Sequence, residues 1–170
     1  SNLVKIEGYQ ISSQLKGFRV ISSVEPIINN LSVVSYGNIY GYADMGVTDS
    51  DMVIDSTNQY VAKYEATQAG IIDRKFGSSD TATYFVRTMT NNGTTAAAYN
   101  ANYKVRAYAV LSDGSVVYSK VYNYSIYKVA RVLYDSCRMP NAASHQYLYN
   151  DILSVVDNNY KKVDYDWGST

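Results

Sequence analysis

Residues 103–126 constrain the fold of this chain most strongly, because they have the pattern of two β-strands joined by a tight turn. The first strand is apolar at every second position, with Val105, Ala107, Ala109 and Leu111 on one face. Asp113-Gly114 then supplies residues that tolerate the positive φ of a hairpin turn. The return stretch, 116–126, is rich in valine and tyrosine, which suit a half-buried sheet. The sequence therefore predicts an antiparallel hairpin with one buried face and one tyrosine-lined face.

Apolar alternation upstream predicts further strands. We expect them near the N-terminus around Leu3, Val4 and Ile6, and at residues 17–22, 31–43, 60–67, 70–76 and 81–90. Pro26 ends the strand at 17–22, because proline has no N–H to donate to a ladder. Gly37 and Gly41 indicate a bulge or a close approach of another segment. We expect the core between two sheets to contain Phe18, Val20, Val86, Val105, Ala107 and Leu111.

The apolar period changes at Ser125, which is a plausible helix N-cap. Helical spacing then relates Ile126, Val129, Ala130, Leu133 and Cys137. Pro140 breaks this helix, and Asn141 is placed to cap a second one. The second helix is expected to present Leu148, Ile152, Val155 and Val156 on one side and to end at residues 157–159.

Strands followed by helices predict an α+β fold that is mainly β. We expect an antiparallel β-sandwich over residues 1–124, with a C-terminal helical hairpin and tail over residues 125–170 packed on it as one unit. The hairpin with Tyr103, Asp113-Gly114 and Tyr118-Ser119 resembles the final hairpin of fibronectin type III and related immunoglobulin-like modules. That resemblance implies an immunoglobulin-like sandwich.

Composition excludes several partners. The 15 basic and 15 acidic side chains give zero formal charge with no basic block, so we expect no nucleic-acid partner. No run of about 18 apolar residues occurs, so we expect no membrane insertion. A single cysteine cannot form an intrachain disulfide, which suits the cytosol and also surface proteins of Gram-positive bacteria. Nineteen tyrosines against three phenylalanines favour a secreted β-module.

Two residues invite a catalytic interpretation. Cys137 and His145 could form a thiol-protease pair, but no orienting third group or family signature accompanies them. No glycine-rich phosphate loop and no Gly-x-Ser-x-Gly motif occurs in the sequence. We therefore expect no enzyme and no cofactor, and we interpret Cys137 and His145 as helix-packing or surface residues.

The acidic segment Asp44, Asp49, Asp51 and Asp55 lies in the longest candidate loop. Carboxylates spaced in this way can hold calcium, but the EF-hand glycine at the sixth place and glutamate at the twelfth are absent. Thr48 and Asp51 have the spacing of a capping pair for a short helical turn. We expect a solvated acidic loop without metal, with calcium binding as the open alternative.

Tyrosines are the remaining candidates for a binding site. Tyr36, Tyr40 and Tyr42 alternate on one expected strand, and Tyr118, Tyr122 and Tyr124 on another. Exposed aromatic rings in a row can stack on sugars, whereas tyrosines at the margin of a core place only their hydroxyls in water. The possible ligand-stacking residues are Tyr36, Tyr40, Tyr42, Tyr118, Tyr122 and Trp167.

A second resemblance concerns function. The runs 84–88, 105–109, 113–114, 117–119, 125–130 and 133–134, with the opening strand 17–20, resemble a module of large secreted or wall-attached proteins from anaerobic gut Gram-positive bacteria. There the module accompanies carbohydrate-active or adhesive domains. The resemblance implies a non-catalytic extracellular or wall-attached module whose partners are neighbouring domains of a larger surface protein. The alternative is a carbohydrate-binding module that uses exposed tyrosines or Trp167 to contact a glycan.

Overall fold

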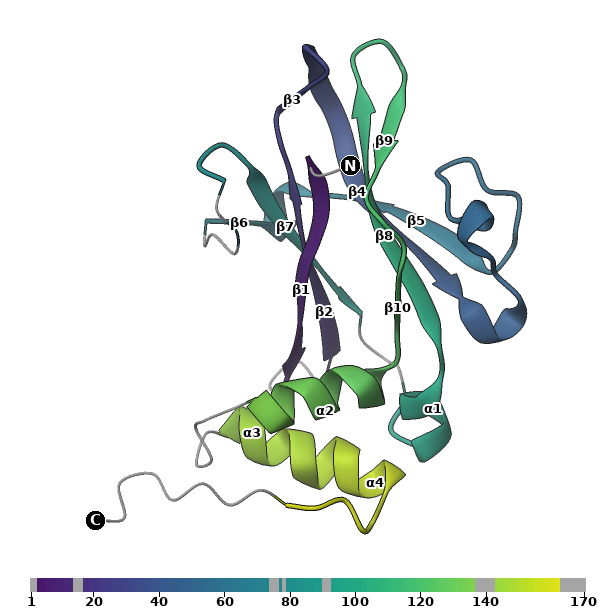
Figure 1. The fold of residues 1–170 in the computed structure, drawn as a ribbon, viewed down its shortest axis with the longest axis vertical. Helices are drawn as coiled ribbons and strands as arrows, with labels where there is room; N and C mark the ends of the chain where they lie inside the picture. Colours follow the sequence, from purple (N-terminus) through teal and green to yellow (C-terminus); the bar gives the residue numbers. More distant parts are fainter. Residues whose placement is uncertain are drawn as a thin grey trace. The chain divides into compact units, whose positions relative to one another are not determined.

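The computed structural model of the 170-residue chain describes residues 3–13, 17–73, 77, 79–89, 93–136 and 143–162. The protein is mainly β, with curled antiparallel sheets and shorter helical elements (Figure 1). Its contacts divide the chain into two compact units. The first unit comprises residues 1–9, 19–88 and 102–124, and the second comprises residues 10–18, 89–101 and 125–170.

The strands of the described residues form two sheets, the first with four strands. Their order across the sheet is β1 (Val4–Ser12), β2 (Gly17–Val24), β7 (Thr83–Met89) and β6 (Ile71–Ile72). β6 pairs antiparallel with β7, so that Ile71 lies opposite Phe85. β2 ends two residues before Pro26, as the missing N–H of proline predicts.

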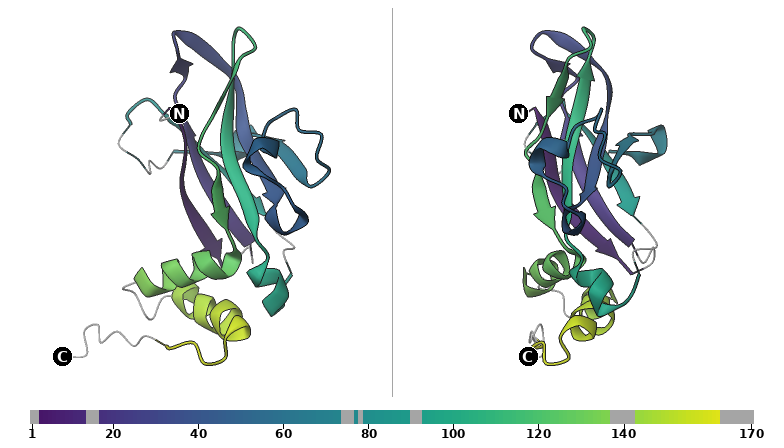
Figure 2. Two further views of the ribbon diagram at one scale, coloured as in Figure 1. Left: turned by 45° about the vertical axis from the view of Figure 1, so that its right-hand side comes forward. Right: turned by 90° about the vertical axis from the view of Figure 1, so that its right-hand side faces the viewer.

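The second sheet has six strands, and its two longest lie side by side at its centre (Figures 1 and 2). Its main path is β10 (Tyr122–Tyr124), β8 (Tyr103–Leu111), β4 (Leu31–Tyr42) and β3 (Ile27–Ile28). In addition, β5 (Val61–Glu65) pairs with β4, and β9 (Val116–Tyr118) pairs with β8. The predicted hairpin turn is confirmed, with Gly114 at φ 86°.

The prediction of one continuous return strand over residues 116–126 is wrong. The segment forms β9 and β10, which are separated by Ser119, Lys120 and Val121. Ser119 donates its N–H to the carbonyl of Ala107 at 2.9 Å, and its Oγ accepts the N–H of Ala107 at 2.9 Å. Because the serine side chain takes the place of a backbone acceptor, the ladder is interrupted here.

Most of the predicted core is confirmed as buried: Phe18, Val20, Val105, Ala107 and Leu111. Val86 is only half-buried, so its assignment to the core is wrong. Phe85, one residue earlier, is 1% exposed, and its ring centroid lies 5.0 Å from that of Tyr36. Successive residues of a strand face opposite sides, so a shift of one residue exchanges the two faces.

Glycines 37 and 41 are explained by close approach. A Cβ on Gly37 would lie 2.1 Å from the carbonyl oxygen of Tyr64, and one on Gly41 would lie 2.7 Å from the sulfur of Met52. The register irregularity of β4 instead falls between Val33 and Ser35. Short 3-10 turns follow β4 and β5: η1 (Ala43–Met45), η2 (Asp49–Asp51) and η3 (Gln68–Gly70).

The second unit contains the α-helices. They are α1 (Ala96–Asn100), α2 (Ile126–Ser136), α3 (Ala143–Tyr147) and α4 (Ser154–Val156), with a π-helical segment, η4 (Leu148–Leu153), between the last two. The predicted cap of α2 is confirmed, because Ser125 Oγ accepts the N–H of Lys128 at 3.1 Å. The predicted cap Asn141, Pro140 and Cys137 lie outside the described residues.

The π-helical segment changes which residues are buried. Leu148 and Ile152 are buried as predicted, but Val155 is 44% exposed, and Leu153 is buried in its place. An i→i+5 turn adds a residue to the helical repeat, so the apolar stripe rotates around the helix. The predicted burial of Val155 is therefore wrong, because it assumed an unbroken α-helical spacing.

Candidate functional site

The six tyrosine and tryptophan candidates do not gather in one place. Tyr36 packs on Phe85, and Tyr40 is buried with its ring centroid 5.7 Å from that of Tyr64. The hydroxyl of Tyr118 accepts the N–H of Ile54 at 3.1 Å. Tyr42 is 51% exposed and Tyr122 is 38% exposed, whereas Trp167 lies outside the described residues. Only Tyr42 and Tyr122 among these tyrosines are exposed.

A row of tyrosines nevertheless crosses β4, β8 and β10. Tyr42 lies opposite Tyr103, which in turn lies opposite Tyr124. Their ring centroids are 5.5 Å and 5.3 Å apart, and the planes of Tyr42 and Tyr103 are inclined by 54°. At the far end of the row the ring of Tyr9 packs on that of Tyr124. Burial raises the pKa of Tyr9 to about 12. The row packs like a core and is open only at Tyr42.

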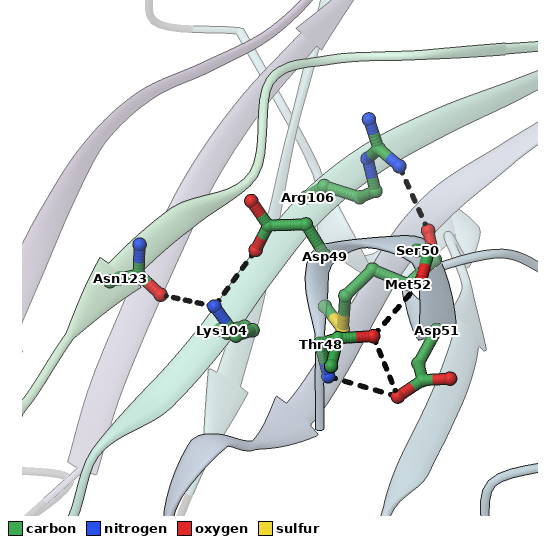
Figure 3. A network of polar contacts seen from close by, with 8 residues as sticks. All are labelled: Thr48, Asp49, Ser50, Asp51, Met52, Lys104, Arg106 and Asn123. Carbon is green, nitrogen blue, oxygen red and sulfur yellow. Dashed lines mark hydrogen bonds and ion pairs between the residues drawn. The ribbon is translucent and has the colours of Figure 1, made fainter. Parts of the chain in front are cut away.

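The acidic loop is held by contacts of its own. Asp44 accepts the backbone N–H of Asn102 and its side-chain amide, both at 2.9 Å, and these bonds lower the pKa of the Asp44 carboxyl. Asp51 forms the predicted capping box with Thr48, which lowers the pKa of Asp51. Asp49 forms an ion pair with Lys104 at 2.8 Å (Figure 3).

These partners explain why acidic residues occur in the loop. Each of the three carboxylates completes a turn or joins the loop to β8 or to the residue that precedes β8. Asp55, the fourth, is exposed. Across the residues that the structure describes, no three His, Cys, Asp or Glu side chains lie close enough together to hold a metal ion.

The same loop covers one face of β4 and β8. Val47 and Met52 are buried against Ile39 and Tyr108 in a single apolar cluster. Arg106 connects this loop to β8, because its guanidinium donates a hydrogen bond to the carbonyl of Met52 at 3.0 Å (Figure 3). The same guanidinium donates two hydrogen bonds to the carbonyl of Ser119, at 2.7 and 3.0 Å. Burial lowers the pKa of Arg106 from its ordinary value. These hydrogen bonds could not be predicted from the sequence, because their acceptors are backbone carbonyls, which every residue has.

His145 is a packing residue in the second unit. It is buried, and its ring stacks on that of Tyr134 with centroids 4.2 Å apart and planes inclined by 17°. Burial lowers the pKa of His145. Cys137, the other member of the pair considered above, lies outside the described residues.

A cavity of about 340 Å³ opens in the second unit. Its apolar wall includes Phe18, Ile126 and Ile152, all buried. Polar groups also line it: Tyr99, Tyr147, Asn150 and Asp151. Burial raises the pKa values of Tyr99 and Tyr147, and Asp151 contributes to both shifts, after Tyr147 in the case of Tyr99. A carboxylate, an amide and two phenol hydroxyls beside an apolar wall can pair with a hydroxylated ligand.

Comparison with known proteins adds no family. A scan against protein-family models finds no match to the chain, and a search of curated proteins finds no matching sequence. Across the described residues, no helix combines the length and the apolar character needed to cross a bilayer.

Proposed function

We propose that this chain is a non-catalytic extracellular or wall-attached module, with a structural or interaction role in a multidomain bacterial surface protein. The observation that carries the proposal is the strand order. In the four-stranded sheet, β1, β2, β7 and β6 correspond to strands A, B, E and D, in the order A-B-E-D. In the other sheet, β9 and β10 together correspond to G, β8 to F, β4 to C and β5 to C′, in the order G-F-C-C′. The two-residue strand β3, which pairs with the start of β4, is additional to this scheme. Immunoglobulin-like sandwiches have this arrangement.

Side chains of the two sheets also contact one another. The ring of Tyr36 on β4 packs on Phe85 of β7, and Asn38 donates from Nδ2 to Ser22 Oγ at 2.8 Å. Tyr9 of β1 packs on Tyr124 of β10, with 5.7 Å between ring centroids. Interdigitation of inner faces is the way in which a β-sandwich forms its core. These contacts support an immunoglobulin-like sandwich, and we infer that the helices complete the same folding unit.

The partners we propose are neighbouring domains of the surface protein. Zero formal charge disfavours nucleic acid. The conspicuous carboxylates of the loop at residues 44–55 take part in capping, pairing and hydrogen bonding that hold the fold. The resemblance of runs such as 17–20, 84–88, 105–109 and 125–130 to a module of wall-attached proteins supports the location.

Antibody labelling tests this proposal. Antibodies raised against the recombinant chain should label intact cells of the producing bacterium, and brief protease treatment of those cells should remove the signal. A cytosolic chaperone labelled in parallel provides the control, because it must stay unlabelled until the cells are permeabilised. Signal that appears only after permeabilisation would overturn the extracellular location.

A carbohydrate-binding module is the second candidate function. The cavity of the second unit favours it, because Asn150 and Asp151 place hydrogen-bonding groups beside apolar side chains. The exposed rings of Tyr42 and Tyr122 offer a separate stacking surface. A glycan array followed by calorimetry should separate the two: Asp151→Asn removes binding in the cavity, and Tyr42→Ala removes binding on the sheet. Failure of every glycan to bind would exclude this second function.

A further inference from the structure

A second cavity, of about 260 Å³, lies entirely within the first unit. Its lining comes from β2, β4, β5 and β7 and from the segment between β5 and β6. Five of its residues carry polar or aromatic chemistry that converges on one space: Arg19, Asn38, Tyr64, Thr67 and Arg87.

Arg87 is held in a fixed position there. Its guanidinium carbon lies 3.9 Å from the centroid of the Tyr64 ring, which is a cation–π contact. The Nε atom of Arg87 is buried and has no hydrogen-bond partner. A buried N–H without an acceptor is unfavourable, so the hydrogen bonding of the Arg87 guanidinium is incomplete.

Arg19 supplies a second guanidinium. Its Nε donates to Thr88 Oγ1 at 3.1 Å. Within the part of the chain that the structure describes, neither Arg19 nor Arg87 forms an ion pair. Glu65 also lines the cavity without pairing to either arginine. Two cationic groups against one carboxylate leave the cavity with a net positive charge, which attracts an anion.

The rest of the lining limits what the anion carries. Asn38 is 1% exposed and is fixed by its bond to Ser22, and Thr67 adds a hydroxyl. These groups pair with hydroxyls of a ligand, whereas guanidinium pairs with carboxylate in a bidentate manner. The volume lies below the roughly 300–1,000 Å³ of sites for drug-sized molecules, so the ligand is small.

We propose that this cavity binds a uronic acid, a single sugar ring that bears a carboxylate. Arg87 and Arg19 hold the carboxylate, while Asn38 and Thr67 hold ring hydroxyls. The inference goes beyond the proposed function and is independent of it. The proposed function depends on the strand order, whereas this site depends on the cavity. It is likewise separate from the exposed tyrosines and from the cavity of the second unit.

The test is an NMR titration of the arginine Nε–H resonances with sodium glucuronate. The Arg87 signal should shift and saturate, whereas glucose, which lacks the carboxylate, and acetate, which lacks the ring, should bind at least about tenfold more weakly. Arg87→Lys keeps the charge but not the fork, and it should weaken glucuronate binding at least about tenfold. Arg131→Lys, on the exposed side of α2, should leave binding unchanged.

Three results would overturn the proposal. The first is the lack of a saturable shift with glucuronate. The second is that acetate or glucose binds as tightly as glucuronate, and the third is that Arg87→Lys binds glucuronate as tightly as the parent. Should Arg87→Lys not fold, Arg19→Gln provides the same test from the other guanidinium, with a lower expected loss. Antibody labelling of cells is unaffected by any of these results, so failure here and failure of the proposed function are distinguishable.

Discussion

Replacing Arg106 with methionine should destabilise the first unit, because Arg106 joins three of its segments through its guanidinium. Arg106 makes three hydrogen bonds to the carbonyls of Met52 and Ser119, and its guanidinium lies 4.7 Å from the centroid of the Tyr118 ring. It thus joins the covering loop, β8 and the break between β9 and β10. Arg106→Met keeps the aliphatic stem and removes all three donors.

The magnitude follows from those bonds. Hydrogen bonds to a charged group contribute about 1.5–3 kcal/mol each, but three bonds that share two acceptors are not additive. Removing the charge also relieves its desolvation, so we expect a net loss of about 2–4 kcal/mol. With a urea m-value of about 2 kcal/mol/M, in the middle of the usual range, the unfolding midpoint should fall by roughly 1–2 M. Arg106→Lys should lose about half as much, since lysine has no planar fork.

Urea unfolding followed by circular dichroism measures this effect. Arg131→Met is the matched control, because Arg131 is exposed on α2. The unfolding midpoint of this variant should be close to that of the parent protein. A midpoint for Arg106→Met within about 0.3 M of the parent would refute the reasoning. So would an equal loss for Arg131→Met, because the effect would then not depend on the loop contacts.

Four further predictions concern the core, the helices, acid and metal. Leu111→Ala should cost about 2–5 kcal/mol in a urea melt, because Leu111 is buried, and an unchanged midpoint would contradict its place in the core. A chain that ends at Tyr124 should give low soluble yield, because it lacks Ile126 and Ile152, which line the same cavity as Phe18 and Tyr99. A cooperative melt near the parent temperature would contradict this. The lowered pKa of His145 means that its stability contribution is complete above about pH 6.5 and is lost as the pH falls; urea melts at two pH values should show a smaller loss in His145→Phe. EDTA should leave the melting temperature unchanged, and a drop that calcium reverses would indicate a metal site.

Local patterns predicted most of the strands, the hairpin turn and the start of α2. The alternation of Val105, Ala107 and Leu111 and the turn at Asp113-Gly114 depend on neighbours in sequence, and the hairpin formed where they placed it. Ser125 caps α2 for the same reason, because a cap bonds to a residue three positions on. The spacing of Thr48 and Asp51 likewise predicted the capping box.

Features that depend on distant partners were not predictable. Ser119 interrupts the return strand by bonding to Ala107, and no local signal in the sequence marks that exchange. The π-helical segment at residues 148–153 rotated the apolar stripe away from Val155. Helix α1 was missed because five residues give too short a pattern, although Thr95 before three alanines is a cap signal.

The candidate sites also depend on distant partners, which local sequence patterns do not show. The tyrosine candidates were chosen by alternation along a strand, which cannot show that Tyr40 is covered or that Tyr42 is open. The arginine cavity was not predictable, because Arg19 and Arg87 are 68 residues apart by their numbers, and their strands are neighbours only in the folded sheet. A basic residue within an apolar strand, such as Arg87 after Phe85, was the one available signal.

The proposed immunoglobulin-like sandwich depends on the packing of the four-stranded sheet on the six-stranded sheet. The direct measurement is an NMR nuclear Overhauser effect between the rings of Tyr36 and Phe85, whose centroids lie 5.0 Å apart. The effect between Tyr42 and Tyr103, neighbours within one sheet at 5.5 Å, is the internal reference. Both effects should be observed. A strong Tyr42–Tyr103 effect without any Tyr36–Phe85 effect would contradict the sandwich and the function proposed from it.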